Sequence, residues 1–386
     1  MIQIPLEPKL TRYLHSKASI TKTPLSVCFE LTPVCNMACR MCYVRMDKKT
    51  QESIAPLRTC KEWLAIAEEA REHGMLFILL SGGEPFTHPE LRGILSGLHD
   101  RGFIVSINSN GTLIDENTIE WLKLTPPSRI NLTLYGASDE TYARLCGKKD
   151  GFTRAARAIE LLQDAGIQVK INVSLTPHNA DDLEGIYAFC KERGLLISAT
   201  SYMFPPLRRD ETCIGQNDRF SPEDAAYYSA KIESLLNGEE AFLKHAEEGN
   251  FAELATAADE DCGLDCTGEG DVIRCRAGKC TGWVTWEGKL LACGMIPDDN
   301  APNVFDIGYM NAWKAVTAET DKIRLPAACR DCSVKNTCKA CAAMVYTESG
   351  DFHTVPEYRC RMAHAYPGQV MKLADEIKSK KIEELT

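Results

Sequence analysis

Residues 35–42 read CNMACRMC, so Cys35, Cys39 and Cys42 lie within one stretch of eight residues. They follow residues 25–31, an apolar run with the pattern of a buried strand. In βα proteins, the loops after the strands carry the ligand-binding residues. Three thiolates leave one metal position open, whereas a structural zinc site needs four ligands. The segment therefore predicts either a metal centre with an open position or a zinc site completed by a distant fourth ligand.

Apolar and amphipathic runs alternate from residue 25 to about residue 201. The apolar runs predict strands at residues 25–31, 76–80, 103–108, 129–135, 168–175 and 195–202. The amphipathic runs predict helices at residues 59–73, 89–101, 115–122, 152–165 and 181–193. Gly74, Gly102, Gly166 and Gly194 follow four of these helices, where a left-handed cap favours glycine. This alternation predicts an α/β fold with parallel strands, as a partial or full βα barrel or an open sheet.

The pattern changes after Pro205 and Pro206. Ser221 and Pro222 have the residue types of a helix start, and a helical stretch follows, with a possible break at Gly238. From about residue 271 the chain is rich in cysteine, glycine and proline, and a last helix is expected at residues 369–384. We therefore expect an N-terminal extension (1–24), a βα domain (25–205), a helical bridge (206–270), a cysteine-rich domain (271–364) and a C-terminal helix (365–386).

Composition narrows the class of protein. The chain has 386 residues, 18 cysteines and a formal net charge of −10. It has no apolar run long enough to span a bilayer and no secretory signal pattern. No basic block is present, which disfavours nucleic-acid binding. In a long chain without an export signal, so many cysteines favour metal or redox chemistry over disulfides. We expect a cytoplasmic protein.

Polar residues end several of the predicted strands. Residues 81–85 read SGGEP after the second strand, where Gly82 and Gly83 allow close backbone approach and Glu84 adds an acceptor. Similar polar positions at the ends of the next three strands are Ser109 and Asn110, then Thr133, then Asn172 and Ser174. Such residues often only satisfy backbone groups, so the pattern alone leaves their role open.

Together these motifs resemble the radical S-adenosylmethionine (SAM) superfamily. The resemblance implies a partial (βα)6 barrel in which Cys35, Cys39 and Cys42 hold a [4Fe–4S] cluster whose open iron binds SAM. It also implies that the glycine–glycine–glutamate motif binds the amino group of SAM, and that Met41 and Tyr43 stand near the adenine. Further SAM contacts are implied for Ser109, Asn110, Thr133, Asn172 and Ser174.

Eight cysteines lie between residues 275 and 360, enough for two four-thiolate sites. Their spacing resembles the SPASM extension of radical SAM enzymes, although two residues rather than three separate Cys338 and Cys341. The resemblance implies two auxiliary [4Fe–4S] clusters, and two structural zinc sites are the alternative. The implied ligands of the first cluster are Cys275, Cys280, Cys293 and Cys341, and those of the second are Cys329, Cys332, Cys338 and Cys360.

The remaining cysteines have less defined patterns. Cys28, Cys60, Cys146 and Cys190 read as ordinary buried thiols. Cys213, Cys262 and Cys266 lie in the bridge, where they could line the active site or contact a cluster, but none of them is expected to do so.

The resemblance implies reductive cleavage of SAM to a 5′-deoxyadenosyl radical, which takes a hydrogen atom from a substrate. We expect a ribosomal peptide substrate and an oxidative change such as a crosslink or thioether. The alternatives are a small-molecule dehydrogenase, a sulfatase-maturation-like protein oxidase, and a non-catalytic iron–sulfur or zinc protein. The oxidase is disfavoured because Gly294, not aspartate, follows Cys293. A flavodoxin- or ferredoxin-type electron donor, and a separate protein that delivers the peptide, are the implied partners, in an anaerobic setting.

Overall fold

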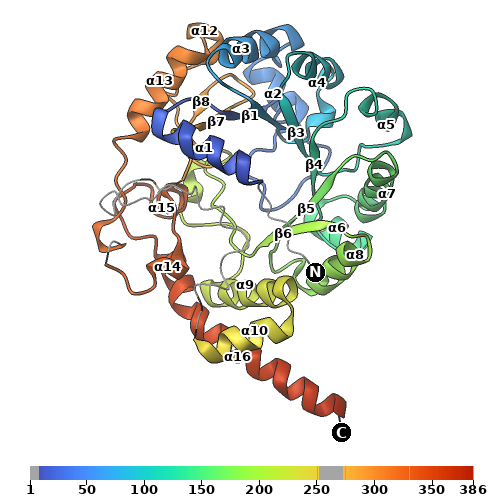
Figure 1. The fold of residues 1–386 in the computed structure, drawn as a ribbon, viewed down its shortest axis with the longest axis vertical. Coiled ribbons are helices and arrows are strands. Elements are labelled where there is room, and N and C mark those ends of the chain that lie inside the picture. Colours follow the sequence, from blue (N-terminus) through green and yellow to red (C-terminus); the bar gives the residue numbers. More distant parts are fainter. Residues whose placement is uncertain (1–7, 250, 252–272, 274, 330, 386) are drawn as a thin grey trace.

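The structure is a computed structural model that describes residues 8–249, 251, 273, 275–329 and 331–385. Six parallel strands form a curved sheet, and a C-terminal hairpin extends it in the order β6-β5-β4-β3-β2-β1-β7-β8 (Figure 1). The strands are β1 (Ser26–Glu30), β2 (Phe77–Ser81), β3 (Ile104–Ser109), β4 (Arg129–Thr133), β5 (Val169–Ser174), β6 (Leu196–Thr200), β7 (Thr281–Val284) and β8 (Leu290–Leu291). The six strands predicted from the apolar runs are confirmed, and so is the α/β fold class.

Helices connect the parallel strands and cover the outer face of the sheet (Figure 1). The five predicted helices are α3 (Cys60–Glu72), α4 (Leu91–Asp100), α5 (Glu116–Leu122), α7 (Gly151–Asp164) and α8 (Leu183–Glu192). Thr59 and Glu62 form a capping box at the start of α3, which satisfies amides that the helix leaves unpaired. The four glycines expected after helices all have positive φ, as a left-handed cap requires.

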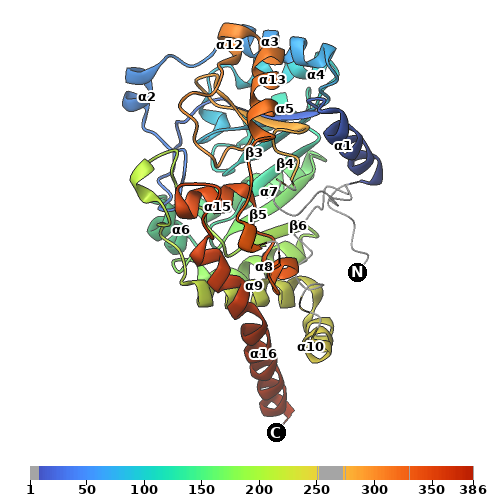
Figure 2. The same cartoon turned by 90° about the vertical axis from the view of Figure 1, so that its left-hand side faces the viewer.

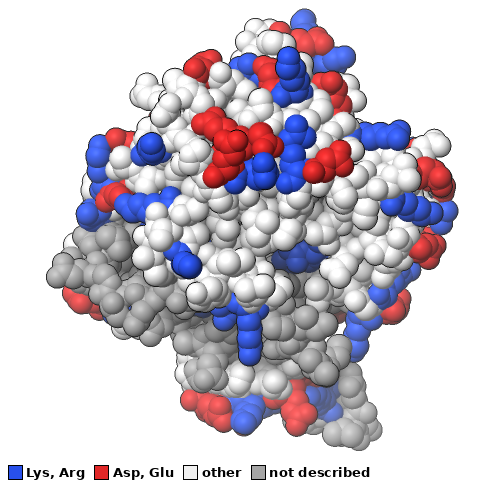
Figure 3. Space-filling model, turned by 45° about the horizontal axis from the view of Figure 1, so that its top comes forward, with Lys and Arg blue, Asp and Glu red and all other residues white. Residues whose placement is uncertain are grey.

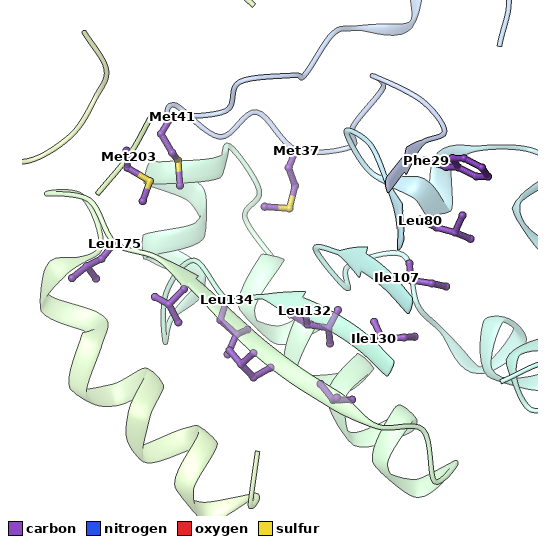
Figure 4. Packing of buried hydrophobic residues seen from close by; sticks show 14 of the residues in the cluster. Phe29, Met37, Met41, Leu80, Ile107, Ile130, Leu132, Leu134, Leu175 and Met203 are labelled. Carbon is purple, nitrogen blue, oxygen red and sulfur yellow. The ribbon is translucent and has the colours of Figure 1, made fainter. Parts of the chain in front are cut away.

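The sheet separates an apolar layer from a polar interior. Along β5 the residues alternate between buried Val169, Ile171 and Val173 and half-buried Asn172 and Ser174. Because successive strand residues point to opposite faces, the apolar set packs against the helices and the polar set lies on the other face. Figure 4 shows the buried apolar residues along the neighbouring strands.

Several elements were not predicted. Helix α1 (Lys9–Thr21) lies in the expected N-terminal extension, and α2 (Lys48–Ile54) and α6 (Asp139–Cys146) follow the first and fourth strands. The largest difference concerns β7, which pairs in parallel with β1 and so makes the cysteine-rich region part of the barrel sheet. The sequence did not predict this pairing, because β1 and β7 are far apart in the chain.

The helices after the barrel close its lower side. Ser221 caps α9 (Pro222–Asn237), and Gly238 separates it from α10 (Glu239–Glu248), as the sequence predicts. The last helix, α16 (Glu357–Leu385), begins well before the predicted residue 369 and projects from the body beyond α9 and α10 (Figure 2). The cysteine-rich region also holds α12 (Val304–Ile307), α13 (Tyr309–Thr320), α14 (Lys335–Cys338) and α15 (Ala342–Ser349).

Two surface properties bear on partners. Among the described residues, no helix has both the length and the apolar composition needed to cross a membrane. Figure 3 shows one face of the molecule, on which Lys and Arg are interspersed with Asp and Glu and the middle is largely uncharged.

Candidate functional site

The three-cysteine loop lies at the carboxyl end of β1, where the fold class predicts a site. Backbone amides point at two of the thiols: Met37 N is 3.4 Å from Cys35 Sγ, and Arg45 N is 3.3 Å from Cys42 Sγ. Burial raises the pKa of Cys35 to about 12, with a further contribution from Glu84. Amide donors of this kind stabilise a thiolate, which is the form that ligates a metal.

Helix α6 holds the middle of this loop. Ala38 N donates to Cys146 O at 2.8 Å, and Arg40 N donates to Leu145 O at 3.2 Å. The loop amides thus satisfy carbonyls that every helix leaves unpaired at its C-terminus. Cys146, expected as an ordinary buried thiol, instead lies beside Cys39 and shares a hydrogen bond with it.

Cys39 differs electrostatically from the other two thiols. The hydrogen bond from Cys146 lowers the pKa of Cys39 against the opposing effect of burial, and Tyr135 adds a second hydrogen bond. Burial raises the pKa of Cys42 instead. Of the three predicted ligands, Cys39 is therefore the one whose thiolate the protein stabilises most.

Gly82 and Gly83 pack directly onto the backbone that leads into the cysteine loop. Gly83 N donates to Thr32 O at 2.7 Å, and Glu84 N donates to Val34 O at 2.9 Å. A Cβ at Gly82 would lie 2.3 Å from Thr32 O, and one at Gly83 would lie 2.6 Å from Val34 O. The two glycines thus allow two backbone segments to touch, and the predicted close approach to a ligand stays a prediction.

Glu84 is fully buried, and its carboxylate joins the glycine loop to the end of β3. It accepts hydrogen bonds from Ser109 Oγ (2.9 Å), Asn110 N (2.7 Å) and Phe86 N (3.2 Å). Burial nevertheless raises the pKa of Glu84 to about 7. The carboxylate was expected to accept from an ammonium group, and that role stays a prediction.

Asn110 connects β3 to the cysteine loop. Its amide nitrogen donates to Asn36 Oδ1 at 2.9 Å and lies 3.7 Å from Cys35 Sγ, while its oxygen accepts from Thr112 N. Asn36 in turn donates to Thr112 Oγ1 at 2.8 Å. The first three strands therefore present one connected polar surface.

Three predicted polar residues from β4 and β5 lie in the barrel interior. Thr133 is in register with Asn172, and Ser174 lies two residues further along the same face. The side chains of these three residues are half-buried and make no hydrogen bond within the described part of the chain. Polar groups that are partly withdrawn from water and unpaired suit a polar ligand.

Met41 and Tyr43 flank Cys42 but lie in different surroundings. Met41 is 7% exposed and lies near Met203 in a buried cluster (Figure 4). The guanidinium carbon of Arg208 lies 5.9 Å from the centre of the Tyr43 ring, and burial raises the pKa of the Tyr43 hydroxyl. The predicted contact of either side chain with adenine stays a prediction.

Sequence reasoning missed a buried ionic junction beside Tyr43. Glu30 at the end of β1 accepts from both terminal nitrogens of Arg208 at 2.8 Å and from Trp283 Nε1 at 2.8 Å. Arg208 also donates to Gly294 O at 3.2 Å. The barrel, the bridge and the cysteine-rich region therefore meet at one carboxylate. The only signal in the sequence was a charged residue at the end of an otherwise apolar strand.

The C-terminal cysteines gather in two places. Burial raises the pKa of Cys293 to about 12, and the nearby thiols of Cys341 and Cys275 add to the rise. Cys280, predicted to join them, is fully buried, and Ser19 Oγ donates to its sulfur at 3.1 Å. Cys275, Cys293 and Cys341 are therefore neighbours, and the place of Cys280 in the first auxiliary site stays a prediction.

The second auxiliary set is compact. Burial raises the pKa of Cys329, and the neighbouring thiols of Cys338, Cys332 and Cys360 raise it further. Cys360 reaches this group from the first turns of α16. All four predicted ligands of the second site are therefore neighbours.

The other cysteines lie away from these groups. Cys28 and Cys190 are buried, Cys60 and Cys213 are partly exposed, and none of the described cysteines forms a disulfide. Cys262 and Cys266 lie outside the described residues. Among the described residues, no group of three His, Cys, Asp or Glu side chains has the arrangement that holds a single metal ion.

Comparisons with known proteins give a matching family model and several relatives. The family model described as "Radical SAM superfamily" matches residues 29–190. An AdoMet-dependent heme synthase from Methanosarcina barkeri is 26% identical over 353 residues, 86% of this chain and 95% of that protein. A PqqA peptide cyclase from Gluconobacter oxydans is 25% identical over 343 residues, 85% of this chain and 89% of that protein.

Among solved structures, Streptococcus suis SuiB bound to S-adenosylmethionine superposes with a TM-score of 0.64 at 18% identity. The match covers 87% of this chain and 77% of that one. At this identity the likeness is one of fold.

Proposed function

We propose that this protein, whose residues 29–190 match the model of the radical SAM superfamily, is a radical SAM enzyme that oxidatively modifies a peptide. The observation that carries the proposal is the connection of the cysteine loop to the ends of β2 and β3 through Gly83, Glu84 and Asn110. That connection holds three thiols beside a polar interior, which is what a cluster with an open position needs.

The residues fit the cofactors that the family implies. Cys35, Cys39 and Cys42 would hold a [4Fe–4S] cluster, and the unpaired side chains of Thr133 and the two β5 residues would hold SAM. When bound, these cofactors supply one-electron cleavage of SAM to a radical that abstracts a hydrogen atom. The apolar residues around Met41 and Met203 would keep water from the site. We further propose auxiliary clusters at the two C-terminal cysteine groups, three clusters in all.

Support for a peptide substrate comes from relatives whose names state it. The PqqA peptide cyclase matches 85% of this chain and 89% of its own length. The same proposal includes an oxidative change such as a crosslink or thioether. It also includes a flavodoxin- or ferredoxin-type electron donor and a separate protein that delivers the peptide. A sulfatase-maturation-like oxidase would need an aspartate directly after Cys293, where this chain has Gly294. An aspartate would not fit there, because a Cβ at Gly294 would lie 2.5 Å from Trp283. The nearby Asp298 and Asp299 are exposed, so this alternative gains no support.

The test is formation of 5′-deoxyadenosine by anaerobically reconstituted protein given SAM and a strong reductant. Cys39→Ala should abolish it, whereas Cys190→Ala, a buried cysteine on α8 away from the site, should retain it. No turnover by protein that holds its full complement of iron would overturn the enzyme assignment and leave an iron–sulfur or zinc protein.

A second candidate substrate is a small molecule. The heme synthase of M. barkeri matches this chain over 95% of its own length, which favours a tetrapyrrole-like substrate. The two candidates separate when SAM turnover is measured with a pool of short peptides and with a set of iron porphyrins. Stimulation by the porphyrins alone would favour the second candidate.

A further inference from the structure

Strand β6 is an open edge of the barrel sheet. It pairs with β5 on one side, and no other described strand pairs with its second edge. In a parallel strand the N–H and C=O of one residue point to the same side, and alternate residues point to opposite sides. Thr200 O accepts from Leu175 N next to β5, so Ile197 and Ala199 direct their backbone groups to the open edge.

A cavity of about 180 Å³ lies along this edge. Residues 197–202 form one wall, and helices α9 and α16 form the second. The third wall contains Thr337 and Lys339, on either side of Cys338 in the second auxiliary cysteine group. The cavity therefore connects the edge of the barrel with the cysteine-rich region.

The walls of the cavity are mainly apolar, and they carry a few polar groups that are fixed in place. On the helical side, Tyr366 donates to Glu233 at 2.5 Å, and both side chains are buried. On the cysteine-rich side, Arg359 donates to Cys338 O at 2.8 Å. Lys339 has a φ of 45°, a conformation that non-glycine residues seldom adopt and that often occurs at functional sites. Groups of both charges beside backbone donors and acceptors suit a ligand that carries both kinds of hydrogen-bonding group.

The direction of the edge links the cavity to the cysteine loop. The carboxyl end of β6 leads through Tyr202 to Met203, which Figure 4 shows beside Met41 of the loop. A chain paired with β6 would therefore extend from the cavity toward the site of hydrogen abstraction.

We propose that the open edge of β6 binds the substrate as an extended peptide, which adds to the sheet through backbone hydrogen bonds at Ile197 and Ala199. The cavity takes one or two of its side chains. This inference rests on the proposed function, because it presupposes a peptide substrate. A peptide has the alternating donors and acceptors that an unpaired strand edge requires, and a flat porphyrin does not.

Ala199→Pro tests the site directly, because proline removes the outward N–H and is tolerated on edge strands. Ala199→Val is the matched control, since it adds comparable bulk and keeps the N–H. The probe is a pool of random decapeptides with blocked ends, added to the reconstituted protein with SAM. Losing one backbone hydrogen bond of about 1 kcal/mol weakens binding about fivefold, and the proline ring adds to the loss. We expect the dissociation constant to rise about five- to tenfold for Ala199→Pro and to change by less than about twofold for Ala199→Val.

Hydrogen exchange in the wild-type protein gives a readout that needs no variant. The peptide pool should slow amide exchange in residues 196–200 and leave α4 unchanged. Equal binding by Ala199→Pro, or no protection of β6 while peptides bind, would place the peptide elsewhere and overturn the inference but not the peptide substrate. No binding of the pool would also overturn it, and 5′-deoxyadenosine formation would still decide the proposed function separately.

Discussion

Glu30 and Arg208 form a two-point ion pair, with both oxygen–nitrogen distances at 2.8 Å, between residues 178 positions apart in the chain. The Glu30 side chain is fully buried and that of Arg208 is 10% exposed. Trp283 and Gly294 add hydrogen bonds from the cysteine-rich region. This pair therefore fixes where the bridge and the C-terminal region stand relative to the cysteine loop.

Arg208→Ala should strongly destabilise the protein, because it leaves the Glu30 carboxylate buried without a countercharge. Breaking a buried pair in this way costs about 3–5 kcal/mol. Arg157→Ala is the matched control, since the Arg157–Glu116 pair is more than half exposed and should cost at most about 1 kcal/mol. Denaturant unfolding measures the free energy of unfolding of both variants. Equal losses would show that the buried ion pair stabilises the protein no more than the exposed one.

Gly83→Ala should lower iron incorporation, because the added Cβ meets the backbone oxygens of Pro33 and Val34 at 2.5 and 2.6 Å. The loop that carries Cys35 must then move. Gly93→Ala is the control: its Cβ would lie 3.4 Å from Cys60 Sγ, and alanine favours the helix by about 0.5–1 kcal/mol. Iron per chain after reconstitution should fall in the first variant alone.

Local patterns predicted the strands and the ligand loop, whereas contacts between residues far apart in the sequence could not be predicted. The β5 alternation and the glycine caps depend on neighbouring residues, so the sequence alone indicated them. The approach of Cys146 to Cys39 depends on how α6 docks on the loop, and the pairing of β7 with β1 depends on the whole barrel. Nothing adjacent to these residues signals either contact, and the charge of Glu30 at the end of an apolar strand does not identify Arg208 as its partner.

Glu84 should make stability fall as pH rises from about 5 to about 7. Burial raises its pKa in the folded state to about 7, above its ordinary value of 4.5. The folded state therefore holds a proton that the unfolded state has already released, and the stabilisation is lost as pH passes through the folded pKa. The difference between the two pKa values corresponds to a loss of ~3 kcal/mol in the free energy of unfolding. Glu84→Gln cannot titrate, so its denaturation midpoint should vary less over this range, and an unchanged slope would exclude Glu84 as the source.

Cys146→Ala should lower the reduction potential of the cluster proposed at Cys35, Cys39 and Cys42. The Cys146 thiol shares a hydrogen bond with Cys39, and donors to a ligating sulfur stabilise the more negative reduced state. A hydrogen bond worth about 1 kcal/mol corresponds to about 40 mV for one electron. Cys146→Ser keeps a donor and should restore most of the potential, and Cys190→Ala should not change it. A redox titration followed by electron paramagnetic resonance measures the shift, and equal potentials in the alanine and serine variants would contradict the role of the hydrogen bond.

The two C-terminal cysteine groups should lose iron independently. The nearby thiols of Cys338 and Cys332 add to the rise in pKa that burial causes at Cys329 and at Cys360, and the thiols of Cys341 and Cys275 do the same for Cys293. Three four-iron clusters would give about 12 iron atoms per chain. Cys360→Ala and Cys293→Ala should each reduce this to about 8, and the double variant should reduce it to about 4. Cys213→Ala is the control, since this partly exposed cysteine lies outside both groups. Full loss of iron from either single variant would mean that the two groups depend on each other, and zinc in place of iron would replace the auxiliary clusters with structural zinc sites.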